Sequence, residues 1–285
     1  RDCFLSQSYY IMAGETMKVA SVWNRRNKIL LRELVVTDFK LRYQGSVLGY
    51  LWSILKPIFL FIILYIVFDK FLRLGRDIEH FPVYLLVGIV LWNFFTEATV
   101  QGLQSIVSRG DLIRKINFPK FIIVVSGTIS AFINLIINTI VILVFCVINS
   151  VSISAEALLI IPLIAELYVF SLAVAFFLAT LNVKYRDIGY LWEIFLQAAF
   201  YATPVIYPLQ MVVKQMPWAA SWLMLNPVAQ VVQDVRKVLV TQQTLQLYDL
   251  VSFPVMLTPF VAVIIVILLA VFYFRSNQRY FAESV

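Results

Sequence analysis

Long apolar runs separated by short polar connections dominate the pattern of this chain. A bilayer core about 30 Å thick is crossed by roughly 20 apolar helical residues, and six runs are of about that length or longer. These runs cover residues 49–68, 82–104, 121–148, 156–181, 188–207 and 252–274. The pattern predicts an all-α membrane protein with six transmembrane helices. Residues 1–48 precede the spans, residues 49–274 form the membrane domain and residues 275–285 form a tail.

Composition and charge support this interpretation and orient the chain. Of the 285 residues, 61% are hydrophobic and 14% are charged, which is more apolar surface than a soluble domain of this size can bury. Connections on one side of the membrane carry 16 Lys and Arg residues, and those on the other side carry six. By the positive-inside rule, the richer side and both termini are expected in the cytoplasm. The net charge of +7 then reflects topology and anionic membrane lipid, and nucleic acid is not an expected partner.

A helix is predicted before the first span, over Ile29 to Tyr43, where helix-forming residues run without proline or glycine. Asp38 and Arg42 are spaced to pair at i, i+4. This composition favours an N-terminal amphipathic helix lying in the headgroup plane, with an ordinary cytoplasmic helix as the alternative. Its apolar face would be formed by Leu30, Leu34 and Leu41.

The connection between the second and third spans, Ser108 to Lys120, is charged and short. Asp111 near its start, Arg114 and Lys115 near its end and Pro119 as a stop signal predict a short helix. Such a helix is either part of a solvated loop or docks into the groove of a partner protein, and the residues alone leave both possibilities open.

The connection from Pro208 to Val251 is too long for a tight turn and too apolar for a free loop. It contains Trp218 and Trp222, and Asn226-Pro227 is a helix-start signal. We therefore expect re-entrant outer helices between spans five and six. The proline-containing segment 203–208 predicts a helix break beside a pathway, because non-helical backbone at membrane depth needs protein or water as a partner.

Catalytic and metal-binding chemistry is poorly supplied. None of the nine glycines forms a GxxxxGK[ST] phosphate loop, so we expect no ATP hydrolysis by this chain. His80 is the lone histidine, and no His/Cys/carboxylate cluster accompanies it. No metal, directly bound cofactor or catalytic residue is therefore expected. Cys3 and Cys146 do not suggest a disulfide framework.

Ionisable side chains within or beside the apolar runs are the first candidates for function. Facing lipid would cost each of them at least about 2.5 kcal/mol, so they should face the bundle interior or an interface. Glu97 and Glu166 lie well inside their spans and serve either a polar pathway or an interhelical hydrogen bond. The full set is Lys56, Glu97, Glu156, Glu166 and Glu193.

Aromatic residues are abundant, with 23 Phe, 14 Tyr and 6 Trp. An interfacial belt accounts for most of them. One subset concentrates around the fifth span, where flat rings could form a track for the CH faces of sugars. That subset is Tyr190, Trp192, Phe195, Phe200, Tyr201 and Tyr207.

Three sequence blocks carry a resemblance to a known family. The segment from Thr37 to Pro57, TDFKLRYQGSVLGYLWSILKP, resembles the region leading into the first span of the ABC-2 type polysaccharide exporter permeases. Residues 112–120, LIRKINFPK, and residues 182–188, NVKYRDI, agree in order and spacing. Residues before Met17 depart from the family pattern, and nothing is assigned to them.

The resemblance implies a fold, partners and cargo. Such permeases dimerise in the bacterial inner membrane and bind two copies of a separate ATPase subunit, which holds ATP and Mg. The implied cargo is a lipid-linked polysaccharide of the O-antigen, capsule or teichoic-acid-like kind. The rival hypotheses are an ABC-2 permease for a small drug or lipid, and a membrane-embedded glycan-modifying enzyme.

The resemblance also implies site residues. Contact with the ATPase maps onto Glu33, Asp38, Ser108, Arg109, Asp111, Leu112, Arg114, Lys115 and Phe118. The outer gate maps onto Pro204, Pro208, Trp218, Trp222, Asn226 and Pro227. The substrate pathway would comprise the aromatic subset with Glu97 and Glu166. Lys40, Arg42 and Lys56 could receive an anionic lipid head at the cytoplasmic entrance, although the positive-inside rule alone would also put basic residues there.

Overall fold

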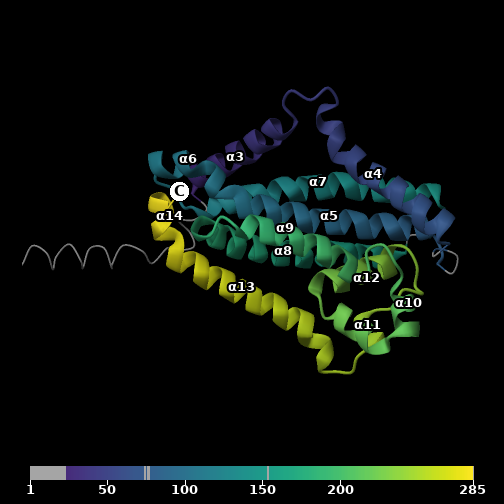
Figure 1. The fold of residues 1–285 in the computed structure, drawn as a ribbon. Coiled ribbons are helices and arrows are strands. Elements are labelled where there is room, and N and C mark those ends of the chain that lie inside the picture. The colour runs from purple at the N-terminus through teal and green to yellow at the C-terminus, as the bar shows by residue number, and fades with distance from the viewer. Residues whose placement is uncertain (1–23, 74, 76–77, 153, 285) are drawn as a thin grey trace, which may run out of the picture.

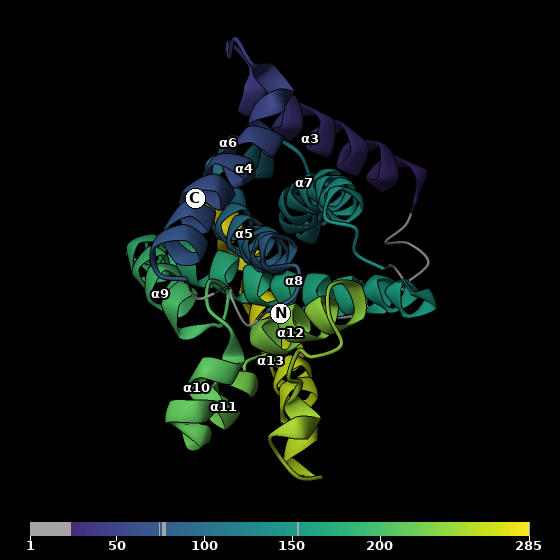
Figure 2. The same cartoon turned by 90° about the vertical axis from the view of Figure 1, so that its right-hand side faces the viewer.

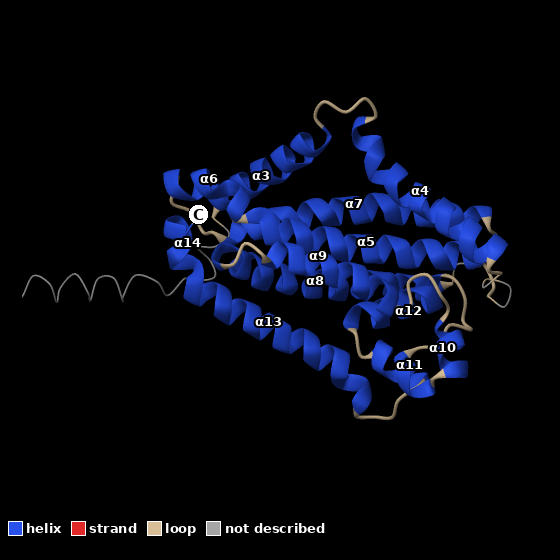
Figure 3. Ribbon diagram, viewed as in Figure 1, coloured by secondary structure: helices blue, strands red, loops and turns tan. Residues whose placement is uncertain are grey.

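The computed structural model describes residues 24–73, 75, 78–152 and 154–284, and in this part of the chain the regular elements are all helical (Figure 3). The all-α prediction is therefore confirmed. Residues 1–23, including Cys3, lie outside the described residues. The α-helices are α3 (Arg25–Tyr43), α4 (Trp52–Tyr65), α5 (Phe81–Ser105), α6 (Gly110–Lys115), α7 (Phe121–Ile148), α8 (Ile160–Lys184), α9 (Ile188–Ala202), α10 (Leu209–Gln215), α11 (Pro217–Met224), α12 (Pro227–Leu239), α13 (Thr258–Asn277) and α14 (Phe281–Ser284).

Four helical segments of the described chain are long and apolar enough to cross a bilayer. They are Phe81–Ser105, Phe121–Ile148, Ala155–Lys184 and Val255–Tyr280, and they correspond to predicted spans two, three, four and six. The other two candidates are irregular. α4 continues as the π-helix η2 (Ile66–Phe71), and α9 has only 15 residues. The count of six spans therefore stays a prediction.

Helix α5 forms the centre of the molecule. It runs alongside α7 and α8 (Figure 1) and is surrounded by α4, α7, α8 and α9 when viewed along the bundle (Figure 2). Of its most apolar 18-residue window, 78% is buried, compared with 17% for the last span. A helix that is apolar on all sides belongs in a core, whereas the exposed apolar face of α13 requires lipid or another protein surface.

One end of the bundle, which we call the basic end, is where α5, α8 and α13 finish and α6 and α14 lie (Figure 1). Phe281 of α14 is 1% exposed, and its ring meets that of Phe274 at 5.4 Å between centroids. Ile113 of α6 belongs to the same apolar cluster. The residues predicted as a tail therefore pack beneath the short helix α6.

The opposite end holds α10, α11 and α12 (Figure 1). α9 ends at Ala202, and residues 203–208 are not helical, which confirms the predicted break. The predicted start of α12 is also confirmed: the Asn226 side chain accepts a hydrogen bond of 3.0 Å from the Val228 backbone N–H, and Pro227 is the first helical residue. The last span begins later than the predicted Ser252, since Pro254 restricts the residue before it.

Candidate functional site

Two cavities flank the central helix α5. The larger, about 1110 Å³, lies between α5 and α9 and is called the groove below. The smaller, about 570 Å³, lies between α4, α5 and α7 and is called the entrance cavity. Asn93, Thr96 and Val100 of α5 line both cavities. One stripe of α5, with two polar residues and Val100, therefore faces both spaces.

The groove brings together four of the six aromatic residues that the sequence singled out. Tyr190, Trp192, Phe200 and Tyr201 line it, and Tyr190 and Tyr201 are 73% and 67% exposed. Trp192 is held in place, because its Nε1 donates a 3.1 Å hydrogen bond to Thr99 Oγ1.

The other two members of the aromatic subset lie next to the groove. Phe195 stacks on Trp192 with ring centroids 4.9 Å apart. The Tyr207 hydroxyl donates a 3.1 Å hydrogen bond to the Tyr201 carbonyl. These two rings support groove residues without lining the groove.

The groove becomes polar toward the basic end of the bundle, where Ser108, Asn182, Arg186 and Glu193 line it. Asn182 Nδ2 donates a 3.1 Å hydrogen bond to the Leu103 carbonyl and ties α8 to α5. Sequence reasoning missed Asn182 and Arg186 as site residues, although both lie in the block at residues 182–188 that carried the family resemblance. Ser108, predicted at the ATPase contact, also reaches the end of the groove.

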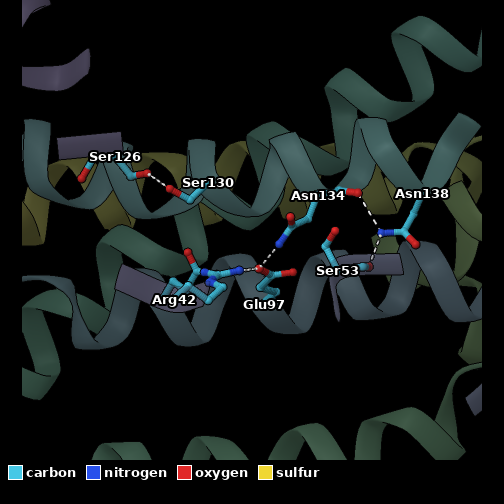
Figure 4. Close-up of polar contacts among 8 residues, drawn as sticks. Arg42, Ser53, Glu97, Ser126, Ser130, Asn134 and Asn138 are labelled. Atoms are coloured by element: carbon cyan, nitrogen blue, oxygen red, sulfur yellow. Dashed lines mark hydrogen bonds and ion pairs between the residues drawn. The ribbon is translucent and has the colours of Figure 1, made fainter. Parts of the chain in front are cut away.

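In the entrance cavity, the Glu97 carboxylate organises three helices (Figure 4). Its Oε1 accepts hydrogen bonds from Gln101 Nε2 at 2.8 Å and from Asn134 Nδ2 at 2.7 Å, and it forms an ion pair with Arg42. One of the two uses that the sequence allowed for Glu97, an interhelical hydrogen bond, is therefore confirmed.

Asn138 holds the wall of the entrance cavity that faces α4. Its Nδ2 donates to the Ser53 carbonyl at 3.1 Å and to the Asn134 carbonyl at 2.8 Å (Figure 4). Two asparagines one turn apart in an apolar span were a signal in the sequence that the charge-based search passed over.

The predicted headgroup residues divide between the cavity and the surface. Arg42 and Lys56 both line the entrance cavity, whereas Lys40 is exposed and does not. Glu166 is also away from both cavities. It lies on α8 within electrostatic reach of Asp234 on α12, and its buried Oε1 has no hydrogen-bond partner among the described residues. The structure therefore separates Glu97 from Glu166.

The expected Asp38–Arg42 pair within α3 is wrong. Asp38 pairs instead with Arg109, and Arg42 pairs with Glu97. Arg109 Nη1 also donates a 2.8 Å hydrogen bond to Ser126 Oγ on α7. All four paired side chains are less than 30% exposed, and screening by water weakens such partly buried pairs less than it weakens an exposed i, i+4 pair. α3 is thus joined by ion pairs at two points, to Glu97 of α5 and to Arg109 in the turn that follows α5.

The predicted helix between spans two and three is present as α6. It presents a charged surface, with Asp111, Arg114 and Lys115 exposed, and an apolar underside, with Ile113 buried. The remaining residues mapped to the ATPase contact differ in exposure: Leu112 is half-buried, Phe118 is buried and Glu33 of α3 is exposed.

At the opposite end, the most notable side chain is one that sequence reasoning did not select. Arg236 of α12 is fully buried. Its Nε donates to the Tyr84 carbonyl at 2.9 Å, Nη1 to the Pro204 carbonyl at 2.5 Å and Nη2 to the Val205 carbonyl at 2.5 Å. Nη1 also donates to Gln233 Oε1 at 3.0 Å, and the guanidinium lies over the Tyr84 ring, 3.7 Å from its centroid.

This arrangement explains how the break after α9 is tolerated. Arg236 supplies donors to the backbone carbonyls that the interrupted helix leaves unpaired. Burial lowers the pKa of the Arg236 guanidinium, opposed by the interaction with Tyr84. Its position was readable in principle, since it follows Val232 by four residues and precedes Leu239 by three on the apolar face of α12.

Of the residues mapped to an outer gate, Pro204 contacts this buried arginine through its carbonyl. Pro204, Pro208 and Pro227 are buried, and Asn226 is half-buried. Trp218 and Trp222 are 68% and 70% exposed. The indoles therefore form a separate exterior patch on α11.

The chemistry that these residues can perform is binding and positioning. Within the described residues, no group of three or more His, Cys, Asp or Glu side chains could hold a metal ion. The groove offers exposed rings, and the entrance cavity offers Arg42, Lys56 and Glu97 together with amides.

Comparison with known proteins identifies relatives that carry the same name. The chain is 28% identical over 258 residues to an O-antigen export system permease protein RfbA of Myxococcus xanthus, covering 90% of this chain and 95% of the relative. It is 29% identical over 204 residues to a protein of the same name from Klebsiella pneumoniae, covering 71% and 77%. The profile of the ABC-2 type transporter family matches residues 29–240. This chain is a multi-pass membrane protein that belongs to the ABC-2 type transporter family.

Proposed function

We propose that this protein is the membrane subunit of an exporter that moves a lipid-linked polysaccharide, such as O-antigen, across the bacterial inner membrane. The observation that carries the proposal is the groove beside α5, which is lined by exposed tyrosines and a fixed tryptophan on α9. Relatives of similar length that are named O-antigen export permeases support it.

The groove suits a polymer better than a compact drug. Exposed aromatic rings contact the CH faces of sugars without fixing one particular ring orientation. Tyr190, Trp192 and Tyr201 offer such rings at several points along the groove, so a sugar chain could move past them. The polar groups at the basic end, Asn182, Arg186 and Glu193, could receive the first hydroxyl groups.

Energy comes from a separate ATPase subunit with ATP and Mg. In this proposal the basic end faces the cytoplasm, and the exposed charges on α6, Asp111, Arg114 and Lys115, meet that subunit. Movement of the ATPase against α6 would reach the membrane helices, because Arg109 joins α3 to α7 and Ser108 reaches the groove. Two permease copies would form the complete path, and a path needs two states with different contacts.

The remaining predicted residues complete the route. Arg42 and Lys56 receive the anionic head of the lipid in the entrance cavity, and Lys40 attracts it at the surface. The break after α9, held by Arg236, lies at the outer gate, with Trp218 and Trp222 at the outer membrane interface.

Substitution of a single exposed ring tests the groove. We expect Tyr190→Ala to reduce surface polysaccharide about three- to tenfold in cells that depend on this permease, if a ring–sugar contact is worth about as much as an aromatic pair, roughly 0.5–1.5 kcal/mol. The control is Phe272→Ala, which removes a 74%-exposed ring from the lipid-facing side of α13 and should leave export unchanged.

Two further measurements, one in the same cells and one on the purified chain, distinguish the rival functions. Altered drug sensitivity with unchanged surface polysaccharide would support the small-molecule permease instead. Chemical modification of a glycan by the purified chain without an ATPase would support the enzyme.

A further inference from the structure

The entrance cavity contains more polar groups than an anionic lipid head requires. Thr96 Oγ1, Asn134 Oδ1 and Asn138 Oδ1 are buried and have no hydrogen-bond partner among the described residues, and all three residues line this cavity. The Asn134 and Asn138 residues are only 5% and 6% exposed. Leaving such groups unpaired is costly, so the cavity is built for a polar occupant.

The orientation of the two asparagines defines what that occupant must offer. Their Nδ2 donors are engaged by Glu97, by the Ser53 carbonyl and by the Asn134 carbonyl. The atoms left available are the carbonyl oxygens Oδ1, which accept hydrogen bonds. An anionic phosphate has no donor to give them. A ligand that pairs these oxygens must therefore carry hydroxyl or N–H groups.

The rest of the lining fits a sugar attached to a phosphate. Trp52, 44% exposed, supplies a ring on which a sugar can stack. Lys56, which has no carboxylate partner among the described residues, and Arg42 supply positive charge against the single carboxylate Glu97. The volume of about 570 Å³ falls within the usual range of small-ligand sites, about 300–1,000 Å³.

We propose that the entrance cavity is a recognition site for the sugar next to the phosphate head of the lipid-linked cargo, read by Thr96, Asn134 and Asn138. The inference rests on the proposed function and adds a selectivity step to it. Because Asn93, Thr96 and Val100 line both spaces, a sugar recognised here lies beside the groove that takes the remainder of the glycan. A bare lipid carrier would bind less well and would not enter the groove.

The direct test measures binding of two lipids to the full-length chain in phosphatidylglycerol nanodiscs. One probe is a polyprenyl pyrophosphate, and the other is the same lipid carrying a disaccharide. We expect the glycosylated lipid to bind at least about fivefold more tightly, the value of one or two uncharged hydrogen bonds.

Thr96→Val is the most informative variant, since the Thr96 hydroxyl makes no hydrogen bond among the described residues and valine keeps its shape. The substitution should reduce the preference for the glycosylated lipid about threefold or more and leave binding of the bare lipid unchanged. Asn138→Leu should reduce it further. The matched control is Thr180→Val on α8, whose hydroxyl bonds locally to the Phe176 carbonyl and lines neither cavity.

Each other outcome overturns the inference in a distinct way. Equal affinity for both lipids in the wild-type protein would remove sugar recognition and leave the proposed export function intact. Loss of the preference in phosphatidylethanolamine nanodiscs, with no change in bare-lipid binding, would assign the asparagines to a lipid ammonium group. Binding of neither lipid would contradict the proposed function as well.

Discussion

Arg236 shows how a single residue can determine local architecture. Its side chain bonds to three backbone carbonyls from two segments, on α5 and in the break after α9, and stacks on Tyr84. Gly88 makes room for it: a Cβ at this position would overlap Arg236 Nη2 and lie 2.7 Å from the Val205 carbonyl oxygen. Gly88 of α5 and Arg236 of α12 therefore depend on each other, because the guanidinium fills the space that a side chain at position 88 would need.

Replacing Arg236 with Met should lower stability by at least about 3 kcal/mol, because several buried carbonyl groups lose their donor at about 1–3 kcal/mol each. Thermal unfolding of the purified protein in detergent measures this change. Lys237→Met is the control, because the Lys237 ammonium bonds to the Tyr248 hydroxyl near the surface and its loss should be small.

The close packing of Gly88 against Arg236 predicts that substitutions at these two positions are not additive. Gly88→Ala alone should destabilise, whereas Gly88→Ala combined with Arg236→Met should cost at least about 1 kcal/mol less than the sum of the two changes, because contacting sites are not additive. Strict additivity would show that the guanidinium does not determine the space at Gly88.

At the scale of the helices, the two ion pairs of α3 are the main departure from the sequence expectation. Asp38 and Arg42 are spaced to satisfy each other along the helix, yet each pairs with another element. Undocked, α3 could pair these charges internally. Its docking on α7 and α5 therefore replaces one ion pair within the helix with two ion pairs to other elements.

Charge reversal tests this docking. We expect Asp38→Arg to lower the apparent Tm, because two guanidinium groups would then face each other beside α7, and Arg109→Asp to do the same. The double reversal should recover most of the loss, though not all, because the 2.8 Å hydrogen bond from Arg109 to Ser126 is removed. Lys40→Glu, at an exposed position of the same helix, should change Tm little. Equal losses in the single and double variants would contradict the pairing.

Much of the element-level fold was predictable because apolar periodicity and helix stop signals are local. The span 121–148 has the predicted bounds, α5 differs by one residue at each end, and Asn226-Pro227 begins α12 as expected. The side-chain partners that lie far apart in the sequence were not predictable. Asp38 and Arg109 are 71 residues apart and Arg236 and Tyr84 are 152 apart, so their pairing depends on how the helices pack.

The candidate site shows the same division. Aromatic composition identified four groove residues on α9, because ring-rich segments are visible in one helix. The polar face of the entrance cavity was missed, since Asn134, Asn138 and Thr96 are uncharged and become a cluster only when α5 and α7 pack together. A search of apolar spans for amides at i, i+4 would have found two of the three.

At the scale of the whole molecule, the candidate sites extend from one end of the bundle to the other. The charged face of α6 and the packed α14 occupy the basic end, the groove and the entrance cavity flank the middle of α5, and the break held by Arg236 lies toward α12. An ATPase acting on α6 would therefore press on elements that lead to the groove.

The most direct test of this account is ATP-driven transport of a lipid-linked glycan by the permease and its ATPase partner in proteoliposomes. Transport should require both subunits and ATP. Arg114→Glu combined with Lys115→Glu on α6 should leave membrane insertion intact and abolish transport while ATP hydrolysis continues. Transport without the ATPase, or unchanged coupling in the double variant, would contradict the account.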